Sequence, residues 1–203
     1  MSHESVRLAV IVGSGRKGRT GTVVARWFVG QVEQRGDTEL DVIDLADFVL
    51  PGEPTENPPS ETARVLRDLS RRLAWADAFV TVTPEYNHSF PASLKAMIDW
   101  HDTEWQAKPV AFVSYGGMSG GLRAVEQLRQ VFPELHAMTI RETVSFHSVW
   151  TQFDRDGRPK DSTGCNAAAK TMLDQLTWWA TALRDARRKS PYRTSGRRLT
   201  YPP

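Results

Sequence analysis

The sequence of 203 residues contains a single cysteine, Cys165, and no apolar run of membrane-spanning length. One cysteine cannot form an intrachain disulfide, so a hydrophobic core must stabilise the fold, and this length is sufficient for one. Residues 1–4 lack the charged region followed by an apolar region that begins a secretory signal. None of the five histidines has the spacing of metal ligands, so we expect no metal site. Together these features predict a soluble cytoplasmic protein with no membrane partner.

Positive charge is concentrated near the C-terminus. The net charge is +2, but residues 184–198 hold seven lysines or arginines and one acid, which leaves the remainder at −4. A basic end of this kind can bind nucleic acid, although such ends are more often solvated. We therefore expect no nucleic-acid partner, one domain over residues 1–187, and a basic C-terminal tail over residues 188–203.

Apolar segments alternate with amphipathic segments along the whole chain. This alternation predicts an α/β fold, a doubly wound five-stranded parallel sheet with helices on both faces. The length suits one such domain and does not suit a dinucleotide-binding domain plus a separate substrate domain. The expected strands are residues 7–12, 40–43, 78–82, 110–113 and a fifth flanked by 138–140 and 144–146; the expected helices are 20–34, 62–75, 91–101, 122–131 and 166–187.

The loop after the first expected strand, residues 13–22, is rich in glycines and cations. Glycines let successive backbone N–H groups point at one anion, and the following helix adds its positive N-terminal end. Hydroxyl and guanidinium groups add further donors. The loop therefore predicts a phosphate site, with donors from Ser14, Arg16, Arg19, Thr20 and Thr22.

The same loop also permits a second interpretation, a dinucleotide-binding Rossmann module. Gly13, Gly15 and Gly18 satisfy the G-x-G-x-x-G pattern, and Asp41 or Asp44 lies near the position of a ribose-binding acid. A pyrophosphate turn needs little positive charge, whereas the three cations of this loop suit a terminal phosphate dianion. That interpretation also leaves two further loops without a role.

Those two loops follow the third and fourth expected strands. Pro84-Glu-Tyr-Asn87 precedes a helix that Pro91 can start, because proline fits the first helical turn. Residues 114–121 form a glycine-rich loop in the same position. Ligands of open α/β sheets bind at this carboxyl edge, where the first of these loops can stack on a flat ring and the second can polarise its edge. We expect His88, next to the first of them, to be a surface residue.

The three loops together resemble the NADPH-dependent FMN reductase family, which has the flavodoxin-like fold. The resemblance covers about residues 6–180 and implies FMN as cofactor, with NADPH or NADH as co-substrate. It rests on Gly13-Ser-x-Arg16, Pro84-Glu-Tyr-Asn87 with Pro91-x-x-Leu94-Lys95 and Asp99-Trp100, and Ser114-Tyr-Gly-Gly-x-Ser-Gly-Gly-x-Arg-Ala124.

The resemblance also implies how the loops share FMN. The first loop would hold the phosphate, the second the isoalloxazine ring, and the third its pyrimidine edge. Arg19 and Gly21 stand where many members carry serine and asparagine, so phosphate affinity here would rest more on charge and on Thr20. The implied binding residues are Ser14, Arg16, Arg19, Thr20, Gly21 and Thr22; Pro84, Glu85, Tyr86 and Asn87; and Ser114, Tyr115, Gly116 and Gly117.

The implied activity is that of an FMN-dependent NAD(P)H oxidoreductase that passes hydride from the nicotinamide to FMN and on to a small acceptor. The acceptor stays open among flavins, quinones, and azo or nitro compounds. No catalytic side chain is expected, because the flavin carries the chemistry. The alternative is a flavodoxin-type electron carrier or FMN-binding partner protein. The near-neutral charge of the chain outside its basic end disfavours an electron carrier, since carriers are usually strongly acidic around the flavin. The family and several late tryptophans also imply a homodimer or homotetramer.

Overall fold

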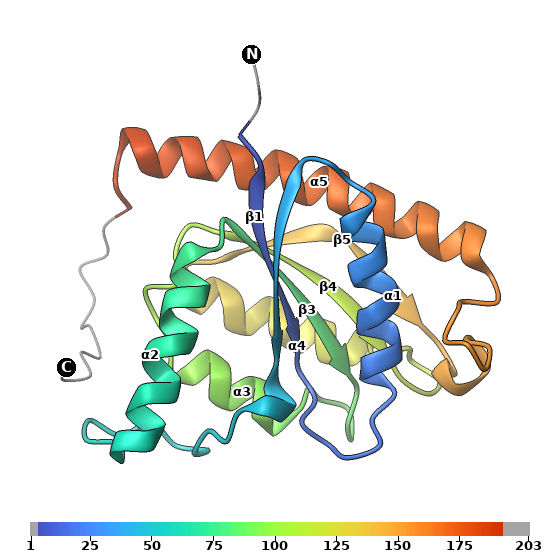
Figure 1. Ribbon diagram of the computed structural model, residues 1–203, viewed down its shortest axis with the longest axis horizontal. Coiled ribbons are helices and arrows are strands. Elements are labelled where there is room, and N and C mark those ends of the chain that lie inside the picture. The colour runs from blue at the N-terminus through green and yellow to red at the C-terminus, as the bar shows by residue number, and fades with distance from the viewer. Residues whose placement is uncertain (1–3, 193–203) are drawn as a thin grey trace.

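In the computed structural model, which describes residues 4–192, five parallel strands form one sheet in the order β2-β1-β3-β4-β5 (Figure 1). The strands are β1 (Val6–Val12), β2 (Thr38–Asp44), β3 (Ala78–Pro84), β4 (Pro109–Tyr115) and β5 (Met138–Phe146). The helices are α1 (Gly21–Glu33), α2 (Ser60–Trp75), α3 (Ala92–Asp99), α4 (Leu122–Glu134) and α5 (Ser162–Lys189), with short 3-10 helices η1 (Leu45–Asp47) and η2 (Val149–Thr151).

Helices cover both faces of this sheet. Every residue of β3 and β4 is buried, which explains why their sequences are continuous apolar runs rather than alternating ones. Successive residues of β1 point to opposite faces, so Val10 packs in the core under α1 and α5, and Ile11 packs in the core under α2, α3 and α4. The predicted flavodoxin-like, doubly wound α/β fold is confirmed.

The structure corrects three expected boundaries. The fifth strand is continuous from Met138 to Phe146, and its polar middle lies at the sheet edge, where the pairing shifts opposite Val110–Phe112. Helix α4 continues through Pro133 to Glu134. Helix α5 begins at Ser162, because the Asp161 carboxylate accepts a hydrogen bond from Gly164 N at 3.0 Å and caps the first turn.

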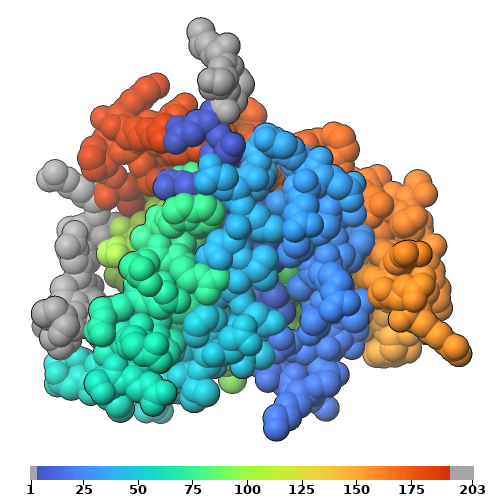
Figure 2. All heavy atoms as spheres, viewed as in Figure 1, coloured from blue at the N-terminus to red at the C-terminus, as the bar shows by residue number. Residues whose placement is uncertain are grey.

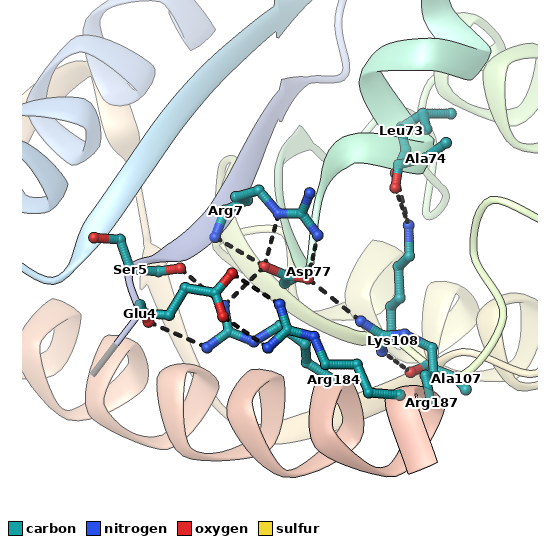
Figure 3. Close-up of polar contacts among 11 residues, drawn as sticks. Glu4, Ser5, Arg7, Leu73, Ala74, Asp77, Ala107, Lys108, Arg184 and Arg187 are labelled. Carbon is teal, nitrogen blue, oxygen red and sulfur yellow. Dashed lines mark hydrogen bonds and ion pairs between the residues drawn. The ribbon is translucent and has the colours of Figure 1, made fainter. Parts of the chain in front are cut away.

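Several arginines converge on Asp77 at the amino ends of the strands (Figure 3). The Asp77 side chain is fully buried, and it pairs with Arg7 at 2.9 Å, Arg184 at 3.2 Å and Arg187 at 3.4 Å. Burial disfavours the charged carboxylate, but hydrogen bonds from Arg7 and the charge of Arg184 outweigh it and lower the pKa of Asp77. This cluster joins the C-terminal half of α5 to β1 and β3.

The cluster shows that the basic segment begins on the domain, so the prediction of a solvated end does not hold for Arg184 and Arg187. Arg184 is only 5% exposed, and Arg187 also donates to the Ala107 carbonyl through Nη1. Helix α5 ends at Lys189, so the first part of the basic segment lies on the domain. Residues 193–203, which make up most of the expected tail, lie outside the described residues.

Lys108 is a second buried cation next to this cluster (Figure 3). Its Nζ donates to the carbonyl oxygens of Leu73 at 2.8 Å and Ala74 at 3.2 Å, in the last turn of α2. These carbonyls have no partner within the helix, so the lysine acts as a C-terminal cap. Burial, assisted by the charge of Arg187, lowers the pKa of Lys108 to about 7.

Candidate functional site

The three predicted loops meet at the carboxyl edge of the sheet, where they line one cavity of about 390 Å³. Because β1, β3 and β4 are neighbours in the sheet, the loops that follow them are brought together. The lining residues are Arg16, Lys17, Gly18, Arg19 and Thr20 of the first loop; Pro84, Glu85 and Tyr86 of the second; Tyr115, Gly116 and Gly117 of the third; and Val149 and Trp150.

The first loop presents the N-terminal end of α1 to this cavity. Thr20 precedes α1, and its side chain makes no capping hydrogen bond, so the hydroxyl and the first helical N–H groups are available to an anion. Arg16 and Lys17 are exposed at the cavity. Arg19 instead pairs with Asp44, which offsets its charge. Helix α1 and two of the three expected cations therefore provide most of the positive potential.

The second loop is a tight turn that is tied to the first. The backbone groups of Tyr86 and Ser89 exchange hydrogen bonds of 2.8 and 3.0 Å, with Asn87 and His88 between them at φ of 49° and 73°. The Tyr86 hydroxyl lies 2.7 Å from the Ser14 hydroxyl, which fixes the aromatic ring relative to the first loop. Asn87 and His88 are both exposed, as expected for His88.

The Glu85 side chain joins the second loop to the third. Its carboxylate accepts hydrogen bonds from Ser119 Oγ at 2.5 Å, Arg123 N at 3.2 Å and Arg123 Nη1 at 3.1 Å. Burial raises the pKa of Glu85, but the bonds from Ser119 and Arg123 outweigh this and lower it. The carboxylate is thus occupied by the third loop, and the Glu85 N–H donates to the Tyr115 carbonyl at 3.1 Å.

Glycines shape the third loop. Gly120 and Gly121 have φ of 60° and 87°, and a Cβ on Gly121 would lie 2.7 Å from the Cβ of Ser114. The Ser114 hydroxyl donates to the Gly120 carbonyl at 2.8 Å, so Ser114 supports the loop and does not line the cavity. Gly116 and Gly117 present backbone to the cavity.

The structure places Tyr115 differently from the sequence prediction, which assigned it to the pyrimidine edge. A Cβ on Gly21 would lie 2.3 Å from the Tyr115 hydroxyl, so the phenol reaches the first turn of α1 and needs glycine there. Burial raises the pKa of Tyr115, which keeps the hydroxyl protonated as a donor. Among residues 4–192, the Tyr115 hydroxyl and Arg19 Nε are buried donors without a hydrogen-bond partner. Two such donors beside a helix N-terminus fit the phosphate group of FMN.

Five of the predicted binding residues do not line the cavity. Thr22 is exposed on α1 and Asn87 on its turn, whereas Gly21 and Ser114 are buried behind the surface. Ser14 lines a neighbouring groove of about 550 Å³ together with Arg16 and Tyr86. These positions therefore support the loops or border the cavity.

Val149 and Trp150 line the cavity, but no sequence motif marked them. They follow β5, the neighbour of β4, so sheet order alone brings them to the third loop. The connector after them also packs on α1, since a Cβ on Gly157 would lie 3.4 Å from Val23 (Figure 2, orange beside blue). Only a prediction of the strand order, with the fifth strand beside the fourth, could have indicated from the sequence that this segment lies at the cavity.

Comparison with known proteins agrees with this geometry. The sequence model of the NADPH-dependent FMN reductase family matches residues 6–151. This chain belongs to the NADPH-dependent FMN reductase family. The predicted family is confirmed, and with it an oxidoreductase that uses FMN and NAD(P)H.

Individual relatives show how far the similarity to this reductase extends. An NAD(P)H-dependent FMN reductase of Schizosaccharomyces pombe is 38% identical over 132 residues, which cover 62% of this chain and 64% of that protein. A quinone reductase of Pseudomonas putida is 34% identical over 181 residues, covering 85% and 93% of the two chains. The solved structure of an NAD(P)H:acceptor oxidoreductase from Paracoccus denitrificans, 22% identical, has a TM-score of 0.68 and covers 87% of this chain and 98% of that one, which supports the shared fold.

Residues 4–192 contain no group of three or more histidine, cysteine, aspartate or glutamate side chains placed to hold a metal ion. Within the same residues, no helix is long and apolar enough to cross a membrane.

Proposed function

We propose that this reductase oxidises NADPH or NADH and reduces a small acceptor, a flavin, a quinone, or an azo or nitro compound, with FMN as its cofactor. The observation that carries this proposal is the convergence of three loops on one cavity with a helix N-terminus at one end. Bound FMN would supply the hydride-transfer chemistry, and the protein would bind and orient it. A P. putida relative is named a quinone reductase, which makes quinones the first acceptors to test.

Each loop has a distinct task in this proposal. Arg16, Thr20 and the first N–H groups of α1 bind the phosphate. Tyr86 and the backbone around it hold the flat ring, and Gly117 directs its N–H at the electron-rich edge of that ring. The Gly116 N–H donates instead to the Phe146 carbonyl at 3.1 Å, so Gly116 shapes the loop. The bond between Tyr86 and Ser14 and the contacts of Glu85 with the third loop keep the three loops in register.

The charge of the cavity favours a reductase over an electron carrier. Its lining includes three cations and one carboxylate. Asp44 offsets the charge of Arg19 and Arg123 offsets that of Glu85, so Arg16 and Lys17 leave the cavity positive. A carrier that docks redox partners would present acidic groups there. We place the reductase in the cytoplasm, in keeping with its use of NAD(P)H.

We also propose that the chain assembles as a homodimer or homotetramer. Large apolar side chains are exposed at Met118 and Trp178, with exposed fractions of 87% and 64%. Aromatic side chains and methionine are enriched at protein interfaces. Sedimentation equilibrium measures the assembly directly, and a monomer at micromolar concentration contradicts this part of the proposal.

Steady-state kinetics test the proposed activity. The FMN-loaded protein is mixed with NADPH and a simple quinone, and NADPH oxidation is followed by the absorbance of the reduced nicotinamide. We expect quinone-dependent oxidation with parallel double-reciprocal plots, because one cavity serves donor and acceptor in turn. Intersecting plots contradict the single shared cavity, and oxidation that does not depend on any acceptor contradicts the proposed reaction.

A further inference from the structure

Trp150 is a large aromatic side chain that stands open at the edge of the flavin cavity. It lines the cavity and is 70% exposed. Its ring edge faces the third loop so closely that a Cβ on Gly117 would lie 3.4 Å from Trp150 Cη2. The indole therefore forms the wall beside the backbone that we assign to the ring edge of the flavin.

The backbone before Trp150 is held firmly to the third loop. Ser148 N donates to the Gly117 carbonyl at 2.8 Å, and Val149 N donates to the Gly116 carbonyl at 3.0 Å. Val149 is 5% exposed and packs in the core under α1 and α5. Ser148 has φ 45° and ψ 52°, a left-handed conformation that a non-glycine residue adopts only where its surroundings impose it.

The backbone on the other side of Trp150 is also fixed. Thr151 Oγ1 donates to the Ser148 carbonyl at 2.9 Å, and Gln152 Nε2 donates to the His147 carbonyl at 2.8 Å. The His147 ring, through Nδ1, lies 2.8 Å from the Met118 carbonyl of the third loop. The backbone on both sides of Trp150 is therefore fixed, which reduces the entropy lost when a ligand packs on the indole.

We propose that Trp150 is a flavin-binding residue, whose indole closes the cavity beside Gly117 and packs on the ring system of the flavin. This inference rests on the proposed function. An uncharged, planar side chain suits the flat ring and adds no charge at the phosphate, which the first loop binds. Removal of the indole should thus weaken FMN and riboflavin alike, because both carry the same ring.

The test is a titration of apo-protein with FMN and with riboflavin, followed by flavin fluorescence. The variants are Trp150→Ala, Trp150→Phe and a matched control, Trp178→Ala. Trp178 is an equally open tryptophan at 64% exposure, but it lies on α5 against Trp179. We expect Trp150→Ala to weaken both flavins by the same factor, about two- to tenfold, the range of one aromatic ring contact. Trp150→Phe should retain most of the affinity, and Trp178→Ala should bind as the native protein does.

Other results overturn the assignment. Native affinity of Trp150→Ala for both flavins means that the indole does not touch the ring, and a loss confined to FMN means that it acts at the phosphate. Unchanged flavin affinity with loss of assembly, measured by sedimentation, reassigns Trp150 to a subunit interface. If the native protein binds neither flavin, the proposed function fails, and that outcome is distinct from these three.

Discussion

Removal of the Asp77 carboxylate should destabilise the fold more than removal of any exposed ion-paired carboxylate. The buried Asp77 is the acceptor for Arg184, whose side chain is 6% exposed, and it also pairs with Arg7 and Arg187 (Figure 3). Asp77→Ala leaves a buried guanidinium without its counter-charge, and breaking a buried pair in this way costs about 3–5 kcal/mol. For a chain of this size such a loss lowers Tm by roughly 6–20 °C.

Thermal and urea unfolding at one fixed FMN concentration measure this change, because bound ligand itself shifts stability. Asp174→Ala is the matched control, since Asp174 pairs with Arg35 and Lys170 but is 47% exposed. Exposed pairs contribute about 0–1 kcal/mol, so the control should stay close to the native protein.

A double variant separates charge from packing. Asp77→Ala with Arg184→Met removes the uncompensated buried charge and should recover part of the stability lost by Asp77→Ala alone. The reasoning is refuted if Asp77→Ala costs no more than Asp174→Ala, or if the double variant is less stable than Asp77→Ala. In the first case the arginines are satisfied by water and carbonyls; in the second Arg184 stabilises mainly through its packing.

Three further predictions concern the flavin site and the pH dependence of stability. Arg16→Ala should lower the affinity for FMN by about 10- to 150-fold, the value of a charge-assisted hydrogen bond, and leave the affinity for riboflavin nearly unchanged. Arg26→Ala, on the exposed face of α1, is the equal-charge control, and equal losses for both flavins mean that Arg16 has a structural role. Gly21→Ala should weaken FMN, because its Cβ would lie 2.3 Å from a tyrosine hydroxyl, whereas Gly30→Ala meets nothing within 4 Å. By helix propensity Gly30→Ala should raise the free energy of unfolding by about 0.5–1 kcal/mol and leave FMN affinity unchanged. If Gly21→Ala also binds FMN as tightly as the native protein, the close contact with the tyrosine is refuted. The folded pKa of Lys108, about 7, lies below its unfolded value, so the unfolded chain binds more protons above pH 7 and stability rises with pH. Between pH 7 and 9, the free energy of unfolding of the native protein, measured with urea, should therefore rise by about 2 kcal/mol more than that of Lys108→Met. Parallel pH profiles of the two proteins contradict this.

The sheet and the three loops could be predicted because each is indicated by residues that are close together in the sequence. β3 and β4 are continuous apolar runs, and each is followed by turn residues that can only lie at the carboxyl edge of a parallel sheet. The alternation of helix and strand then brings the loops together. The middle of β5 was harder to predict, since an edge strand with polar residues lacks a buried run.

The parts that sequence did not predict depend on contacts between distant residues. Arg184 and Asp77 are 107 positions apart, so a basic run near the C-terminus gave no sign that one of its arginines is buried. The pairing of Arg19 with Asp44 and the reach of Tyr115 to Gly21 are set by side-chain direction, which spacing does not contain. Trp150 lines the cavity because β5, which precedes it, lies beside β4 in the sheet.

The most direct test of the flavin-reductase account is an absorbance spectrum of the protein supplied with FMN, passed through gel filtration, and then mixed with NADPH without oxygen. The account predicts that the yellow flavin stays with the protein, that the visible flavin absorbance is lost when NADPH is added, and that it returns when a quinone follows. A flavin that separates from the protein, or one that stays bound but keeps its absorbance after NADPH, contradicts the account.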